Sequence, residues 1–110
     1  MKFIKENVKL GKKIFLYGAS TKGNTLLQYY GLTSNEIPFA AERTKTKWGK
    51  YTIGSGVKIL SEEDARKLRP DYFFVMPYGF IKEFVKREKK WLKSGGKFIL
   101  PYPKFKILNK

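Results

Sequence analysis

The chain contains neither cysteine nor histidine. Without cysteine it can form no disulfide bond and no thiolate zinc site, and a metal site would depend on carboxylates alone. The two absences also remove the commonest general base and the best side-chain nucleophile found in enzymes. The composition therefore predicts no catalytic residue, no metal site and no catalysis by this chain on its own.

Acidic residues are scarce: the chain has 9 Asp and Glu against 24 Lys and Arg, a formal net charge of +15 at pH 7. A surface of this charge favours anionic partners, such as nucleotides, nucleic acid or an acidic face of another protein. A lysine-rich surface can equally serve solubility alone. The charge by itself leaves both interpretations open.

Long apolar runs are missing as well. No stretch approaches the roughly 18–20 apolar residues that a membrane-spanning helix needs. The first residues, Met1–Glu6, lack the apolar core of a signal peptide. We therefore expect a cytoplasmic protein without a membrane partner.

What the chain does contain is an alternation of short β-type runs and helical patterns. Strands are predicted at residues 14–17, 37–41, 57–60, 72–76 and 97–100. Helices between strands call for a parallel sheet with right-handed crossovers. The sequence therefore predicts the α/β class: a small Rossmann-like three-layer domain over residues 1–110, with a mainly parallel sheet of about four to five strands.

Three helical patterns connect these strands. The first follows the loop at residues 18–25 and ends near Gly31, and the second has a capping box that begins at Ser61. The third is predicted as one long helix over residues 80–92, with its basic residues, Arg87 among them, in water. Residues 2–12 favour a short amphipathic helix, or the tail of a longer one.

Residues 13–27 predict a strand, a glycine-containing turn and a helix start, the unit with which α/β proteins hold phosphate. The nucleoside-triphosphate signature lacks its lysine, because Asn24 takes that position. The dinucleotide signature has Ser20 where its middle glycine belongs. The turn is therefore predicted to contact phosphate or sugar without hydrolysing a nucleotide. Alternatively, Gly18 and Gly23 only let the strand and the helix pack closely.

Ligands of parallel sheets bind at the carboxyl ends of the strands. Four segments rich in glycine, lysine and aromatic residues are expected to meet there: 18–25, 42–56, 77–79 and 101–103.

The second of these segments carries a cluster of basic and aromatic residues. The cluster could clamp a diphosphate and stack a base, or it could be a solvated lysine loop in which Trp48 closes the core. Glu42 stands where dinucleotide enzymes bind ribose, and the alternative for it is a solvated loop carboxylate beside Arg43.

Four stretches, in order along the chain, resemble one enzyme family: Tyr17-Gly-Ala-Ser-Thr-Lys-Gly-Asn-Thr-Leu-Leu27, Lys50-Tyr-Thr-Ile-Gly-Ser-Gly56, Asp71-Tyr-Phe-Phe-Val-Met-Pro77 and Gly95-Gly-Lys-Phe-Ile-Leu-Pro101. They are similar to the C-terminal domain of the sugar C-methyltransferases. These enzymes use S-adenosylmethionine to methylate a carbon of nucleotide-linked deoxysugars. The resemblance extends from about Gly11 to Pro103.

The resemblance implies that the full enzyme has an N-terminal zinc-binding domain and a central domain that binds S-adenosylmethionine. Both cofactors and the main catalytic residues are then expected outside this chain, and a catalytic methyltransferase domain becomes its partner in cis or in trans. Residues 1–12 would be the end of an inter-domain helix. One departure is the turn Pro77-Tyr78-Gly79-Phe80, which lacks the polar side chain that the family tends to have there.

The leading hypothesis is a domain that assists the binding of a nucleotide-diphospho-sugar and the packing of domains, without being catalytic alone. Its predicted substrate-binding residues are Gly18, Ser20, Lys22, Gly23, Asn24, Thr25, Lys45, Lys47, Tyr51 and Tyr78. Two alternatives stay open: a purely structural or interaction domain, and a nucleotide- or nucleic-acid-binding module that uses the basic surface. Against nucleic acid, the lysines are spread over every segment, and the strands lack the aromatic signature of common RNA modules.

Overall fold

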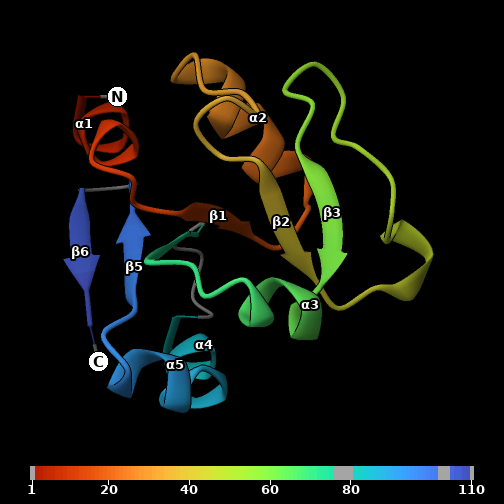
Figure 1. Cartoon of the computed structure of the whole chain (residues 1–110). Helices are drawn as coiled ribbons and strands as arrows, with labels where there is room; N and C mark the ends of the chain where they lie inside the picture. The colour runs from red at the N-terminus through yellow and green to blue at the C-terminus, as the bar shows by residue number, and fades with distance from the viewer. Residues whose placement is uncertain (1, 76–80, 102–104, 110) are drawn as a thin grey trace.

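The computed structural model describes residues 2–75, 81–101 and 105–109 (Figure 1). In chain order its elements are α1 (Lys2–Lys9), β1 (Ile14–Tyr17), α2 (Thr21–Tyr29), β2 (Phe39–Glu42), the 3₁₀ turn η1 (Lys45–Lys47), β3 (Lys58–Ser61), α3 (Glu62–Lys67), β4 (Tyr72–Phe74), α4 (Ile81–Arg87), α5 (Lys89–Lys93), β5 (Lys97–Leu100) and β6 (Lys106–Leu108). The predicted site residue Tyr78 and its segment 77–79 lie outside the described residues, as do residues 102 and 103.

The described strands form one six-stranded sheet in the order β3-β2-β1-β4-β5-β6. β1 to β5 run parallel, so that Leu16 of β1 lies between Ala40 of β2 and Phe74 of β4. β6 pairs antiparallel with β5. The α/β class and the mainly parallel sheet are confirmed. The sheet has one strand more than the sequence predicts, because the terminal segment, interpreted as a basic tail, pairs with β5.

The strand order indicates where in the sheet a ligand is expected to bind. From β1 the chain moves outward through β2 to β3, and then crosses back to place β4 on the other side of β1. The order therefore reverses beside β1, and in sheets of this kind ligands bind at the carboxyl ends of the strands next to such a reversal. The turn that follows β1 lies at this edge.

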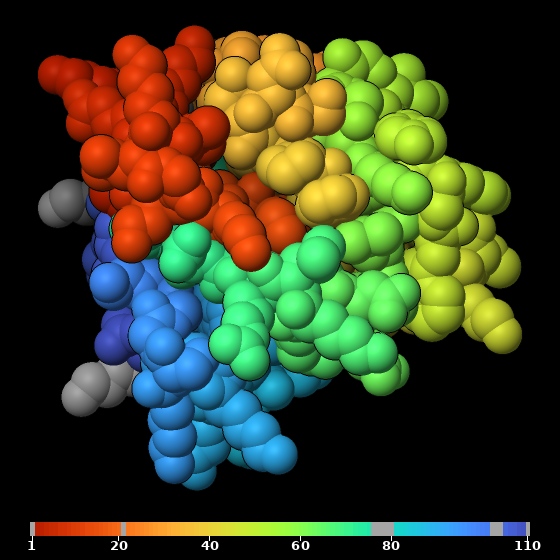
Figure 2. Space-filling model, in the orientation of Figure 1, coloured from red at the N-terminus to blue at the C-terminus, as the bar shows by residue number. Residues whose placement is uncertain are grey.

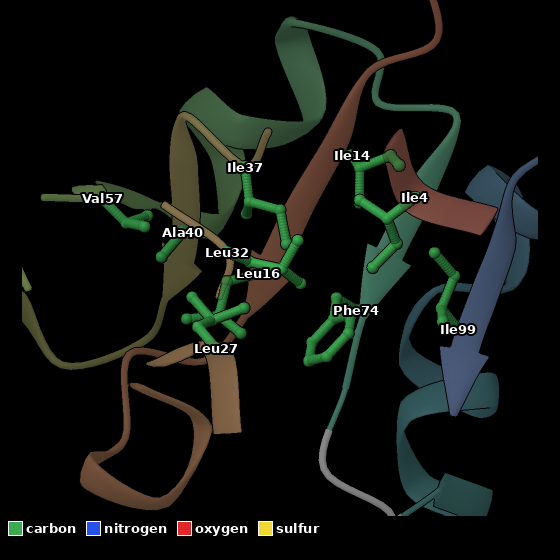
Figure 3. Packing of buried hydrophobic residues seen from close by; sticks show 10 residues of the cluster. All are labelled: Ile4, Ile14, Leu16, Leu27, Leu32, Ile37, Ala40, Val57, Phe74 and Ile99. Atoms are coloured by element: carbon green, nitrogen blue, oxygen red, sulfur yellow. The ribbon is translucent and has the colours of Figure 1, made fainter. Parts of the chain in front are cut away.

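One face of the sheet is covered by α1 and α2. Ile14 and Leu16 of β1 pack in a cluster with Ile4 of α1, Leu27 of α2 and Phe74 of β4, all of them at most 1% exposed (Figure 3). Ile4 fixes α1 to the core, which confirms a helix near the amino terminus. No helix in the described part of the chain is both long and apolar enough to cross a membrane.

The opposite face of the sheet is covered by α3, α4 and α5 (Figure 1). Phe15 and Tyr17, which alternate with the residues of the first face, pack there with Ala65 of α3 and Trp91 of α5. Alternate residues of β1 thus pack into two cores, one on each face of the sheet. The layers are helix, sheet and helix, as predicted. Burying a phenylalanine as completely as Phe73 of β4 stabilises the fold by about 1.5–3 kcal/mol.

The helix predicted over residues 80–92 is interrupted. α4 ends at Arg87 and α5 begins at Lys89, while Glu88 between them has φ −100° and ψ 23°. Glu88 is 1% exposed, because its carboxylate turns inward, where it pairs with an arginine described below. Arg87 is half-buried rather than solvated, so its prediction as a residue in water is wrong.

The 43–57 segment, between β2 and β3, joins two parallel neighbours without an α-helix. After η1 it turns back beside β3, where Gly49 N–H donates to the Ile59 carbonyl and Ile59 N–H donates to the Lys50 carbonyl, both at 2.8 Å. It thereby covers the outer edge of β3, and in Figure 2 it forms the right-hand side of the molecule. The short edge strand predicted at residues 57–60 is confirmed as β3.

Candidate functional site

The β1–α2 corner, residues 18–24, has the predicted strand–turn–helix geometry. Gly18 turns the chain at φ +87°, a conformation that favours glycine. Ser20 is the N-cap of α2, and its Oγ accepts a hydrogen bond from the N–H of Gly23 at 3.0 Å. A serine cap of this kind stabilises a helix by about 1 kcal/mol. The predicted contact residue Ser20 is thus already bonded within the chain.

Glu42, at the end of β2, is hydrogen-bonded to the β1–α2 corner. Its Oε1 accepts the N–H of Ala19 at 2.7 Å, and its Oε2 accepts the N–H of Thr44 at 3.0 Å. The residue is 9% exposed, so its interpretation as a solvated carboxylate is wrong. The Gly18 N–H donates to the Ala41 carbonyl at 2.7 Å. Two backbone donors of the turn are therefore bonded to the chain's own oxygens.

Electrostatics keep Glu42 ionised. Burial alone would raise the pKa of its carboxyl group, but the hydrogen bonds from Thr44 and Ala19, together with the charge of Lys47, lower the pKa below its usual value. A negative charge is therefore fixed at a corner that, in phosphate-binding sheets, receives the charge of the ligand.

The 43–57 segment packs onto the first turns of α2. Asn24 Nδ2 donates to the Ile53 carbonyl at 2.9 Å, and Asn24 Oδ1 accepts from Ser55 Oγ. Gln28 Nε2 reaches the same carbonyl at 3.3 Å. Gly54 favours this contact, because its φ of +81° suits glycine and a Cβ there would have to displace the end of the Gln28 side chain. Both ends of the Asn24 amide thus hold the two segments together.

The remaining predicted contact residues lie around this junction. Lys47 Nζ donates to the Ala19 carbonyl at 3.4 Å, which connects η1 to the corner. Lys45 is exposed on η1, and Tyr51 is 62% exposed where it pairs with Lys58. Lys22 and Thr25 have exposed side chains on the first two turns of α2.

The two segments predicted to meet, 18–25 and 42–56, therefore do meet at the carboxyl edge of the sheet. Trp48 is 39% exposed, so it does not close the core. Its ring is nevertheless anchored, because Nε1 donates to the Glu42 carbonyl at 2.8 Å. The meeting with segments 77–79 and 101–103 falls partly outside the described residues.

A cavity of about 300 Å³ opens beside the corner, where the ends of β1 and β2 meet the first turns of α3 and α4. Three acidic and two basic residues line it, together with the aromatic residues Tyr17 and Phe84. The charged residues are Glu42, Glu62, Glu83, Arg43 and Arg87. This cavity is called the edge cavity below.

A family model described as the C-methyltransferase C-terminal domain matches residues 1–103. The chain belongs to this family. The chain is also 38% identical over 99 residues to the C-methyltransferase NovU of Streptomyces niveus. That match covers 90% of this chain and 24% of NovU, so the chain spans about a quarter of the length of its curated relative.

In this C-methyltransferase C-terminal domain, a buried network that the sequence analysis missed supports the edge cavity. The Tyr17 hydroxyl donates to Glu88 Oε2 at 2.7 Å, and Arg66 Nε donates to Glu88 Oε1 at 2.8 Å. Burial first, and then the hydrogen bond to Glu88, raise the pKa of the Tyr17 phenol far above its usual value. The hydrogen bond to Glu88 likewise raises the pKa of Arg66. The phenol therefore stays a donor and Arg66 stays charged.

The network also positions Arg87 in the cavity wall. Arg87 Nε donates to the Tyr17 hydroxyl at 3.0 Å, and its two terminal nitrogens lie 3.4 Å from Glu62 Oε2 and 3.9 Å from Glu83 Oε1. Its guanidinium carbon is 5.3 Å from the centroid of the Phe84 ring. One arginine thus holds two carboxylates and two rings in place.

A signal for this network does exist in the family domain's sequence. Glu88 lies seven residues after Ile81 and four after Phe84, on the apolar stripe of the predicted helix. A carboxylate at such a position needs a cationic partner, because an unpaired buried charge is very costly. Arg66, on another helix, could not be identified as that partner from sequence spacing.

Proposed function

We propose that this domain assists a C-methyltransferase by helping to enclose a nucleotide-diphospho-sugar and by packing against the catalytic part of the enzyme, without reacting itself. The proposal is supported chiefly by the junction at the carboxyl edge, where the lysine-bearing 43–57 segment is tied to the turn after β1. This edge adjoins the reversal of strand order, the usual place for a ligand in such sheets.

The predicted contact residues divide into two groups under this proposal. Ser20 and Asn24 shape the junction through bonds within the chain, whereas the cationic side chains of Lys45 and Lys47 contact the diphosphate. Lys22, Thr25 and Tyr51 flank the same surface.

The cofactors of the reaction are expected on other parts of the enzyme. The chain has no cysteine or histidine, and the described residues contain no group of three or more possible ligands placed to hold a metal ion. A zinc ion of the complete enzyme would therefore take its ligands from outside this chain. S-Adenosylmethionine, which supplies the methyl group, is likewise assigned by this proposal to the catalytic part.

The first test is a titration of the full chain with thymidine-diphosphate-glucose, followed by Trp48 fluorescence and by amide shifts in NMR spectra. We expect shifts in the β1–α2 corner and in the 43–57 segment at millimolar ligand. The double substitution Lys45→Ala and Lys47→Ala should weaken binding about tenfold, since each removes a charged contact to phosphate. Lys97→Ala is the matched control, because Lys97 is exposed at the opposite, amino-terminal edge of β5. An unchanged spectrum at these segments would refute direct binding.

A purely structural role is the second candidate, and two exposed apolar side chains favour it. Ile53 is 86% exposed and Tyr29 is 80% exposed. Ile53 belongs to the contact between the 43–57 segment and α2, where its carbonyl accepts from Gln28, and Tyr29 is the next residue of α2. If this role is the whole function, Lys45→Ala and Lys47→Ala will leave kcat and KM of the reconstituted enzyme unchanged.

A further inference from the structure

We infer that the edge cavity binds an uncharged polyhydroxyl ring, the sugar or the pentose of a nucleotide-sugar, and excludes its phosphates. The inference rests on the proposed function, because it assigns one part of that ligand to one position. It goes further by naming the part and by predicting that the turn after β1 is closed to anions.

The charge of the cavity is the first argument, and it indicates that the cavity excludes phosphate. Glu42, Glu62 and Glu83 stand against Arg43 and Arg87, so the lining has one more negative than positive charge. Arg87 is already engaged with Glu62, Glu83 and the Tyr17 hydroxyl. A phosphate in the cavity would therefore lie among three carboxylates, while one of the two guanidinium groups, that of Arg87, is already engaged, which is electrostatically unfavourable.

The hydrogen-bond acceptors in the cavity are the second argument, and they indicate that the ligand offers hydroxyl groups. An ionised carboxylate accepts at about four lone-pair sites, and Glu42 uses three of them, for the N–H groups of Ala19 and Thr44 and for the Thr44 hydroxyl. Glu42 is held in a fixed position by these bonds, and about one acceptor site remains for a ligand. Hydroxyl groups are the donors that such acceptors satisfy, whereas phosphate at neutral pH is chiefly an acceptor.

The shape and walls of the cavity carry the third step. Its volume of about 300 Å³ is at the lower end of the roughly 300–1,000 Å³ found for small-molecule sites. Phe84 and Tyr17 are part of the wall, and the Arg87 guanidinium lies over both rings, so the C–H face of a sugar ring can pack against the ring surface that the guanidinium leaves uncovered. The three glutamates are not placed to hold a divalent cation together, since the described residues contain no group of three or more ligands arranged for a metal ion.

The test compares four probes on the full chain by NMR: methyl glucoside, thymidine, thymidine diphosphate and thymidine-diphosphate-glucose. We expect millimolar methyl glucoside or thymidine to shift the amides of Gly18, Ala41, Arg43 and Phe84. Shifts with methyl glucoside assign the cavity to the sugar ring, and shifts with thymidine assign it to the pentose. In the Lys45→Ala and Lys47→Ala variant, which lacks the proposed diphosphate contact, thymidine diphosphate that still shifts these amides more strongly than both neutral probes would overturn the inference, as would no shift of the wild-type chain with any probe.

The substitution Glu83→Gln distinguishes the two possible occupants, because it weakens ligand binding in one case and strengthens it in the other. Glu83 lies at the rim with its side chain 60% exposed, so the variant should fold normally. If the cavity holds the sugar ring, the variant will bind thymidine-diphosphate-glucose about three- to tenfold more weakly and thymidine diphosphate equally well. If it holds the pentose, the variant will bind both more weakly. If phosphate lies in the cavity, loss of the negative charge will strengthen both. Glu63→Gln, the same change on an exposed side chain paired with Lys67, is the control.

The same experiment separates this inference from the proposed function. Shifts confined to residues 44–57 that depend on Lys45 and Lys47, with Gly18, Ala41, Arg43 and Phe84 unchanged, would keep the proposed function and refute the cavity. Shifts confined to the cavity that ignore both lysines would keep the cavity and refute the diphosphate contact.

Discussion

Glu42 shows how one side chain can change what a familiar turn does. Its carboxylate accepts hydrogen bonds from the N–H of Ala19, in the turn after β1, and from the N–H of Thr44, after β2. Burial keeps water from competing for these bonds. A turn whose glycines suggest phosphate binding thus carries an anion of its own. No sequence pattern around residues 18–24 reveals this, because the anion comes from a strand 23 residues away from Ala19.

The pH dependence of stability tests the role of Glu42. Its folded-state pKa lies below the unfolded value of about 4.3, so its contribution is complete above that value and is lost as the pH falls through the folded-state pKa. Glu42→Gln should lower the unfolding free energy at pH 7 by about 1–2 kcal/mol and flatten its decline below about pH 4. Urea unfolding across this range is the measurement. Glu63→Gln should keep the wild-type profile, and a Glu42→Gln profile parallel to the wild type would contradict the assignment.

At the scale of elements, α3 ends in a strained residue. Arg69, just after the C-cap Leu68, has φ +52°, and its N–H donates to the Arg66 carbonyl at 3.0 Å. This left-handed position is the one that glycine favours after a helix.

Arg69→Gly should therefore stabilise the protein by about 0.5–1 kcal/mol, because glycine adopts this conformation without a clash of its Cβ. Arg69→Ala keeps the Cβ and should give no such gain. Thermal unfolding of the two variants beside the wild type measures the difference. A rise in Tm for Ala equal to that for Gly would show that the arginine side chain, and not the backbone, is the cause.

Helix boundaries show what periodicity can and cannot predict. The capping box at Ser61 is confirmed, with Ser61 Oγ accepting from the N–H of Asp64 at 3.0 Å. The break at Glu88 was not predicted, because it depends on a carboxylate reaching Arg66 on a different helix. Local signals predict where a helix starts, but a tertiary ion pair decides where this one is interrupted.

At the scale of the whole molecule, the charge of +15 acts on stability. Like charges repel in the compact state, and the ion pairs of Lys2 with Glu6 and of Lys67 with Glu63 are exposed and weak. Raising the salt from about 20 to 300 mM shortens the screening length and should raise Tm by a few degrees. Differential scanning calorimetry measures this shift. A fall in Tm with salt would instead show that attractive pairs dominate.

The fold was largely predictable, because alternating apolar residues and helix signals repeat along the chain. Burial of Phe73 and Phe74 agrees with the prediction that their strand is central. The site was predictable only in outline. The meeting of segments 18–25 and 42–56 follows from parallel strand ends, but the bonds of Asn24 to Ile53 and Ser55 depend on how a helix-free connection folds back.

The antiparallel strand β6 has a consequence for how the domain can be produced. The family match ends at residue 103, before β6 begins. A recombinant fragment cut there would leave the apolar β5 as the outermost strand, with its backbone donors and acceptors bare along that side. Such an edge recruits the strands of other molecules and leads to aggregates. Asn109 also secures β6, since its Nδ2 donates to the Gly96 carbonyl at 2.8 Å, so soluble fragments should retain residues 106–109.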